Sequence, residues 1–213
     1  MTVLTHRYTQ AVDYARIAHA AQKRKGTAIP YIAHLLGVSS LVLDYGGDED
    51  QAIAGLLHDV LEDCGAEHEA TIRAQFGDAV ATIVKDCTDG TAEGKERAVT
   101  PEAKRADWWE RKLRYVDHLA NESDASLLVS ACDKLHNARA VVTDMQGAAG
   151  LRVFDRFKAG RDGTLRYYES LARVFLKRAG AEGSRAHELA REFDRTVATM
   201  HALAGVSDRE ALS

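Results

Sequence analysis

The chain has 213 residues, enough for one domain with a substantial core, and we predict a single domain over residues 1–213. Its 28 Lys and Arg against 32 Asp and Glu give a formal net charge of -4, which removes any reason to expect a nucleic-acid or anionic-membrane partner. No apolar run approaches the roughly 20 residues that span a bilayer, and residues 1–10 lack a leader pattern, so we expect a soluble, cytoplasmic protein.

Helical spacing of the apolar residues dominates the chain, only 2 prolines occur, and no stretch alternates as a strand does. We predict an all-α fold of about eight to ten helices, with a core over about residues 5–178 and a last helix over about 184–204. Gly26 should end the first helix, and the polar stretch 89–100 should form a loop. The predicted helices, in chain order, cover about residues 5–24, 30–45, 48–59, 67–76, 78–88, 101–120, 124–137, 167–175 and 184–203.

The cysteines Cys64, Cys87 and Cys132 are odd in number and form no CxxC pair. This pattern is unlike a disulfide framework and fits a reducing cytosol. We expect all three to be small, buried side chains.

A polar run, His58-Asp59-Val60-Leu61-Glu62-Asp63, follows the apolar body of the third predicted helix. At roughly 100° per residue its four polar residues fall within an arc of about 140°. His58 and Asp59 are suitable donors for a divalent metal ion, and Glu62 and Asp63 lie one turn on, where a carboxylate can exchange a proton with water. A solvated polar helix face is the alternative, but carboxylates crowded on one turn repel each other unless a cation is present.

Further ligands are expected from His34 and Asp133, because each interrupts an otherwise apolar helix. Alone, His34 would more often be a core histidine with satisfied hydrogen bonds, and Asp133 a partner of Lys134 or Arg139. Together with the polar run they indicate a metal site.

The order of these residues resembles the HD superfamily of metal-dependent phosphohydrolases. Three blocks, 24–34, 56–63 and 133–139, are more narrowly similar to the alarmone hydrolases. Those enzymes remove pyrophosphate from the 3′ position of guanosine tetra- and pentaphosphate, as part of bifunctional proteins or as small stand-alone hydrolases. The resemblance extends from about residue 12 to about residue 175, and nothing matches the family's synthetase or regulatory domains.

The resemblance implies that one divalent ion, manganese in the family, is bound by His34, His58, Asp59 and Asp133. It also implies that Glu62 and Asp63 activate or orient the attacking water.

Four further positions match residues that contact the nucleotide: Arg24, Lys25, Asn137 and, by a looser alignment, Tyr167. A solvated helix end is the alternative for Arg24 and Lys25, and core packing is the alternative for Tyr167.

Three departures from the family's pattern concern the substrate more than the chemistry. Leu35 replaces the proline that usually follows the first histidine, the loop between Lys25 and Pro30 is compact, and the stretch 89–104 aligns with nothing in the family. The resemblance implies that the partner is a small nucleotide. Hydrolysis of another nucleotide, such as the 2′-phosphate of NADPH, and a non-catalytic nucleotide sensor are the alternatives. The sequence is compatible with a monomer or a homodimer.

Overall fold

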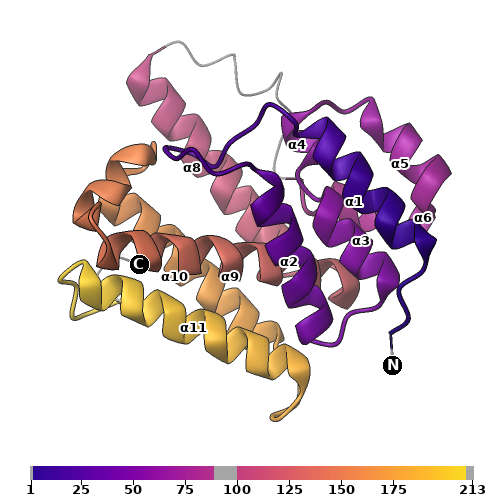
Figure 1. Cartoon of the computed structure of the whole chain (residues 1–213). Coiled ribbons are helices and arrows are strands. Elements are labelled where there is room, and N and C mark those ends of the chain that lie inside the picture. The colour runs from indigo at the N-terminus through magenta and orange to yellow at the C-terminus, as the bar shows by residue number, and fades with distance from the viewer. Residues whose placement is uncertain (1, 89–99, 210–213) are drawn as a thin grey trace. The chain divides into compact units, whose positions relative to one another are not determined.

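The computed structural model describes residues 2–88 and 100–209, and in these ranges every regular element is a helix (Figure 1). The only β-type pairing in the same ranges is an isolated antiparallel bridge between Lys23 and Pro30. The predicted all-α fold is therefore confirmed. The predicted loop over 89–100 falls almost entirely outside the described residues.

The internal contacts divide the described chain into two compact units, residues 2–88 with 122–133 and residues 100–121 with 134–209. Helix α9 (Asp124–Gln146) begins in the first unit and ends in the second, well beyond the predicted end at about residue 137. The single domain over residues 1–213 stays a prediction.

The first unit packs short helices around α3. Its short helices are α1 (His6–Ala18), α2 (Ile32–Asp44), α3 (Glu49–Leu57), α4 (Val60–Asp63), α5 (His68–Phe76) and α6 (Asp78–Asp86). Helix α3 contacts α1, α2 and α6, and α5 packs on α6. Burial of all its residues from Ala52 to Leu57 makes α3 the centre of this core.

Two local features place α3. Asp48 caps its first turn in a capping box with Gln51, which satisfies backbone N–H groups that a helix start leaves unpaired. Gly55 lets α2 approach closely, because a Cβ at this position would lie 3.2 Å from Cα of Ser39. Because α2 and α3 pack closely, the first turn of α2 with His34 and the end of α3 with His58 belong to the same unit.

The second unit contains α8 (Pro101–Leu119), the rest of α9, the 3-10 helix η1 (Gly150–Arg156), α10 (Gly160–Arg178) and α11 (Arg185–Leu203). Helix α10 contacts α8, η1 and α11. Phe175 and Phe193 meet edge to face, with ring centroids 5.0 Å apart, inside the α10–α11 interface. The predicted last helix is confirmed, and Ser184 caps it by accepting from the His187 N–H.

The predicted first helix, residues 5–24, is too long: α1 ends at Ala18. Beyond it the backbone N–H of Tyr31 donates to the carbonyl of Gln22 (3.0 Å), and the N–H of Arg24 donates to the carbonyl of Ile29 (2.9 Å). Residues 22–31 therefore form a narrow, hairpin-like loop, whose turn includes Gly26 at a φ of 72°. Lys23, Arg24 and Lys25, at the predicted end of the first helix, lie in this loop.

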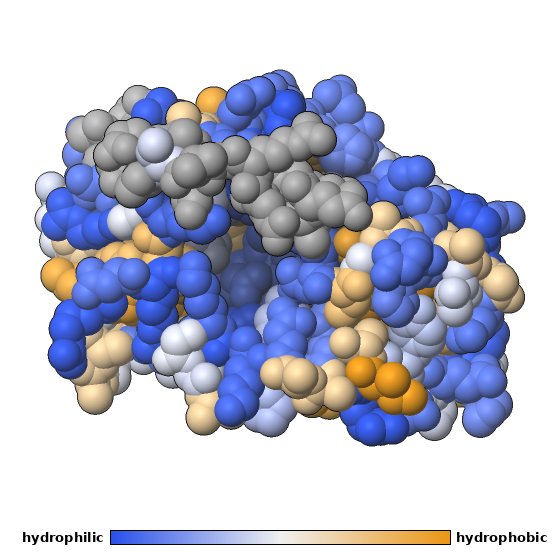
Figure 2. Space-filling model, turned by 90° about the horizontal axis from the view of Figure 1, so that it is seen from above, coloured by the Kyte–Doolittle hydropathy of each residue, from blue (hydrophilic) through white to orange (hydrophobic). Residues whose placement is uncertain are grey.

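The cysteines are free thiols, as predicted; Cys87 and Cys132 are buried, whereas Cys64 is partly exposed. The face seen in Figure 2 is mainly hydrophilic, with small apolar patches between the polar side chains. Within the described ranges, no helix combines the length and the apolar character needed to cross a bilayer.

Candidate metal centre

The four predicted metal ligands come from four places in the first unit. His34 is the third residue of α2, His58 follows the last residue of α3, Asp59 precedes α4, and Asp133 lies on α9. The prediction that the polar run continues one helix is wrong, because α3 ends at Leu57 and α4 begins at Val60.

A side-chain hydrogen bond accompanies the interruption of the helix. Nδ1 of His58 lies 2.9 Å from the carbonyl oxygen of Gly55, which in a continuous helix would accept from the N–H of Asp59. Since a carbonyl only accepts, the proton is on Nδ1, and Nε2 is the nitrogen that faces the carboxylates. The backbone N–H of Asp63 still donates to the Asp59 carbonyl (2.9 Å), so one helical turn joins the two halves of the run.

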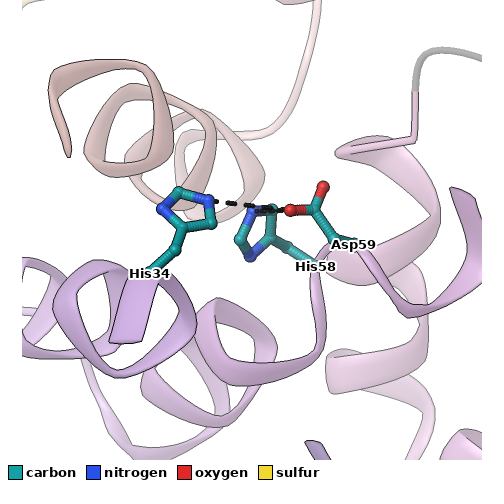
Figure 3. A group of neighbouring side chains, drawn as sticks. All are labelled: His34, His58 and Asp59. Atoms are coloured by element: carbon teal, nitrogen blue, oxygen red, sulfur yellow. Dashed lines mark ion pairs between the residues drawn. The ribbon is translucent and has the colours of Figure 1, made fainter. Parts of the chain in front are cut away.

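The side chains of His34, His58 and Asp59 converge, with ligand atoms within 4.8 Å of one another (Figure 3). Oδ2 of Asp59 lies 3.0 Å from Nε2 of His58 and 3.6 Å from Nε2 of His34. Oδ1 of Asp133 completes the group, 3.2 Å from Nε2 of His34 and 3.5 Å from Nε2 of His58. Each imidazole nitrogen therefore faces two carboxylate oxygens in an alternating ring of four atoms, which we call the ligand ring.

Burial makes this arrangement electrostatically demanding. Both histidine side chains are at most 2% exposed, and Asp133 is 7% exposed. Burial alone would lower the pKa of His58, but the carboxylates of Asp59 and Asp133 outweigh it and hold that pKa well above its ordinary range. Burial likewise opposes ionisation of Asp59, but the charge of His58 and the nearby imidazole nitrogens of His34 and His58 hold the pKa of Asp59 well below its usual range.

The ligand ring has the dimensions of a coordination shell. With ligand atoms about 2.1 Å from a divalent ion, neighbouring ligands lie about 3.0 Å apart in octahedral and about 3.4 Å apart in tetrahedral geometry. The four nitrogen–oxygen separations of 3.0 to 3.6 Å cover this range. Despite its short distance to Asp59, Nε2 of His58 makes no hydrogen bond of ordinary geometry with any described residue. Imidazole and carboxylate ligands fit Mn²⁺ and similar ions.

The other predicted residues lie in both units. Glu62 and Asp63 are on α4, the former half-buried and the latter exposed. Arg24 and Lys25 are in the loop after α1. In the second unit, Asn137 lies on α9, and Tyr167 on α10 is 7% exposed, with its ring edge to face against Trp108.

Two residues beside the ligand ring were missed by sequence reasoning. The hydroxyl of Tyr31 donates to Oδ2 of Asp59 (2.5 Å), and Nε2 of Gln22 donates to Oδ2 of Asp63 (2.8 Å). Burial, together with the Asp59 charge, raises the pKa of Tyr31 far above its ordinary value, so its hydroxyl keeps its proton. Tyr31 belongs to the first block of resemblance, which was the available signal, whereas Gln22 lies outside every block.

Comparison with known proteins identifies the family. The model of the HD domain family matches residues 11–165. The chain belongs to the HD domain family. The HD-domain protein is also 35% identical, over 133 residues, to the guanosine-3′,5′-bis(diphosphate) 3′-pyrophosphohydrolase MESH1 of Xenopus tropicalis. It is 30% identical, over 136 residues, to the protein of the same name from Drosophila melanogaster.

These matches cover 61% and 62% of the HD-domain protein, and 66% and 68% of the two relatives. A solved structure, described as a metazoan ortholog of SpoT that hydrolyses ppGpp and plays a role in starvation responses, shares the fold. Its TM-score is 0.67 at 23% identity, over 97% of this chain and 99% of that chain. The predicted resemblance to HD proteins and alarmone hydrolases is confirmed.

Proposed function

We propose that this HD-domain protein hydrolyses the 3′-pyrophosphate of guanosine tetra- and pentaphosphate, giving pyrophosphate and GDP or GTP. The observation that carries the proposal is the ligand ring, in which two imidazole nitrogens alternate with two carboxylate oxygens. Neighbouring atoms of the ring are 3.0 to 3.6 Å apart, close to the separations between ligands that share one divalent ion. The names of the two MESH1 relatives support the choice of substrate.

We further propose that His34, His58, Asp59 and Asp133 hold one divalent ion, manganese. When bound, such an ion lowers the pKa of water and neutralises charge that develops on phosphate oxygens. Four protein ligands leave positions open on a six-coordinate ion. The chain's own contribution is to present three ligands from rigid helix ends and the fourth from α9, so that little rearrangement is needed.

The chemical step requires a group that takes a proton from the attacking water. Glu62 and Asp63 are our candidates, because α4 places them within one turn of Asp59. The water oxygen forms a bond to the phosphorus attached to the 3′ oxygen, and one carboxylate receives the water proton. The bond from phosphorus to the 3′ oxygen breaks, and that oxygen leaves as a hydroxyl after it takes the proton held by the carboxylic acid.

Arg24, Lys25, Asn137 and Tyr167 are the proposed nucleotide contacts. Two cationic side chains suit the polyphosphate of the substrate, since phosphate recognition relies on Arg and Lys donors. Individual replacement of Arg24 and Lys25 by Met should raise the KM for guanosine tetraphosphate more than it lowers kcat.

A substrate panel tests the proposal. The purified, chelator-treated protein is incubated with guanosine tetraphosphate, GTP, NADPH or p-nitrophenyl phosphate, with and without Mn²⁺, and products are separated by ion-exchange chromatography. We expect GDP and pyrophosphate from guanosine tetraphosphate, only with metal. Absence of turnover by protein with one bound Mn²⁺ would refute the assignment, and faster phosphate release from NADPH would move it to the 2′-phosphatase alternative.

The sensor alternative is separated from the enzyme by a double variant, Glu62→Gln with Asp63→Asn. An enzyme should lose turnover by at least about 100-fold and keep Mn²⁺ and nucleotide binding, since general acid–base groups contribute roughly 10²–10⁴-fold. The matched control is Glu67→Gln with Asp78→Asn, which removes two carboxylates elsewhere in the first unit and should leave turnover unchanged. Wild-type protein that binds the alarmone tightly without consuming it would establish the sensor.

A further inference from the structure

The loop that follows α1, residues 19–31, makes hydrogen bonds to two carboxylates of the polar run, those of Asp59 and Asp63. Gln22 and Tyr31 are joined by a backbone hydrogen bond, from the Tyr31 N–H to the Gln22 carbonyl (3.0 Å). Their side chains reach different carboxylates: that of Gln22 donates to Asp63, and that of Tyr31 donates to Asp59. The two loop residues that are paired through the backbone therefore contact a proposed metal ligand, Asp59, and a proposed acid–base group, Asp63.

The amide of Gln22 has a defined orientation. A carboxylate can only accept, so Nε2 must be the atom that lies 2.8 Å from Oδ2 of Asp63. Its Oε1 then lies 2.6 Å from Nδ1 of His19 and must accept a hydrogen bond from the Nδ1–H. The direction of both hydrogen bonds is therefore specified: His19 donates to Gln22, and Gln22 donates to Asp63.

His19 is itself held in place. Its side chain is only 3% exposed, and its ring stacks on the ring of Tyr31, with centroids 5.2 Å apart and an interplanar angle of 30°. Sγ of Cys64 lies 3.6 and 3.7 Å from its two ring nitrogens. Burial and nearby carboxylates raise the pKa of the Cys64 thiol to about 11, so this neighbour is uncharged.

This enclosure distinguishes the Gln22–Asp63 contact from an ordinary surface hydrogen bond. Asp63 is exposed, and an exposed carboxylate on a four-residue helix would normally sample several rotamers in water. Gln22 is restrained at both ends of its side chain, because the buried His19 imidazole holds the amide oxygen and the pairing with Tyr31 holds the backbone. A restrained donor limits the positions that the carboxylate can occupy.

We propose that Gln22, oriented by His19, is a positioning residue that holds the Asp63 carboxylate in the place from which it acts on the attacking water. The inference rests on the proposed function, in which Asp63 is an acid–base group. Displacement of a reacting group by about 1 Å can cost roughly 100-fold in rate, so the loss of this hydrogen bond should act on kcat and leave substrate affinity nearly unchanged.

The test uses Gln22→Met in the full-length, Mn²⁺-loaded protein. Methionine has nearly the volume and length of glutamine but neither of its hydrogen bonds, so packing is retained while the donor is removed. Gln10→Met, on an exposed position of α1, is the matched control. We expect Gln22→Met to lower kcat by about 10- to 100-fold and to change KM and the Kd for Mn²⁺ by less than about threefold, with Gln10→Met like wild type.

A double-mutant cycle links the effect to Asp63. In an Asp63→Asn background, Gln22→Met should cost little further activity, because the group that it positions has already been removed. An equal loss in both backgrounds would overturn the inference. A second variant, His19→Phe, removes the donor to Gln22 while keeping an aromatic ring beside Tyr31, and should lower kcat in the same direction.

Crystal structures of wild type, Gln22→Met and Gln10→Met supply a readout that needs no substrate. The Asp63 carboxylate should occupy one conformation in wild type and in Gln10→Met, and should be displaced or spread over several conformations in Gln22→Met. An unmoved Asp63 in Gln22→Met would overturn the inference whatever the substrate. Wild-type protein that is inert toward the alarmone would instead overturn the proposed function, while the position of Asp63 still decides this inference.

Discussion

Occupation of the ligand ring by Mn²⁺ should raise the thermal stability of the protein, because the ion binds only the folded chain. At a free ion concentration 100 times the Kd, the stabilisation is about 2.7 kcal/mol. For a chain of 213 residues, 1 kcal/mol corresponds to roughly 2–4 °C, so Tm should rise by about 5–11 °C. Differential scanning fluorimetry, at concentrations chosen from an isothermal titration, measures this shift.

The decisive variant for this prediction is Asp133→Asn, which keeps the shape of the side chain but removes its charge. Asp133 Oδ1 lies within 3.5 Å of both imidazole nitrogens, so its loss should weaken metal binding by at least about 100-fold. At the same Mn²⁺ concentration the stabilisation then falls to about 0.4 kcal/mol, a shift of about 1–2 °C. The variant without metal should be less stable than wild type near neutral pH, since the Asp133 carboxylate stabilises the charged imidazole of His58.

Asp86→Asn is the matched control for the charge change. Asp86 accepts a hydrogen bond from the hydroxyl of Ser126 in the same unit and takes no part in the ligand ring. Its variant should keep the full Mn²⁺-induced shift. A full shift in Asp133→Asn, or no shift in wild type at saturating Mn²⁺, would refute the assignment of the four ligands.

Three further predictions concern the surroundings of the ligand ring and the second unit. The Mn²⁺ affinity should rise with pH across neutrality, because the raised pKa of His58 means that the ion must displace a proton from this imidazole. Titration calorimetry in buffers of different ionisation enthalpy should detect about one released proton. A Kd for Mn²⁺ that does not change with pH would contradict this prediction. Gly55→Ala should destabilise the fold by about 1–2 kcal/mol and weaken Mn²⁺ binding, since the new Cβ would lie 3.2 Å from the Ser39 backbone and push α2 away from α3. Chemical denaturation measures the change in stability. A more stable variant would show that the two helices are not tightly packed at this point, because alanine is the better helix former. Tyr167→Phe should raise the stability by about 1 kcal/mol, which is a few degrees in Tm, because the buried Tyr167 hydroxyl has no hydrogen-bond partner among the described residues. It should also raise KM, because Tyr167 is a proposed nucleotide contact. A lowered Tm would contradict the first expectation, and an unchanged KM would contradict the second.

Two helix starts and the grouping of the candidate ligands could be predicted because each has a local signature, whereas α10 begins at Gly160, well before the predicted start at about residue 167. Asp48 and Ser184 stand at the predicted starts of two helices, and in the structure their side chains cap these helices. His34 and Asp133 are polar interruptions of apolar helices, and the structure brings both beside His58.

What the sequence could not supply depends on contacts between distant segments. Helical periodicity continues past Ala18, but the chain leaves α1 there because Gln22 pairs with Tyr31 through the backbone. The interruption after Leu57 coincides with a side-chain hydrogen bond between His58 and the Gly55 carbonyl, which periodicity does not reveal. Gln22 carries no pattern of its own, since its importance lies in a partner 41 residues away.

The fate of the attacking water is the most direct test of the central claim. Single-turnover hydrolysis of guanosine tetraphosphate by the Mn²⁺-loaded protein in ¹⁸O-labelled water, followed by mass spectrometry of the products, locates the new bond. Attack at the phosphorus attached to the 3′ oxygen should place one ¹⁸O atom in pyrophosphate and none in GDP. Label in the ribose hydroxyl of GDP, release of orthophosphate in place of pyrophosphate, or turnover that survives complete removal of metal would contradict the account.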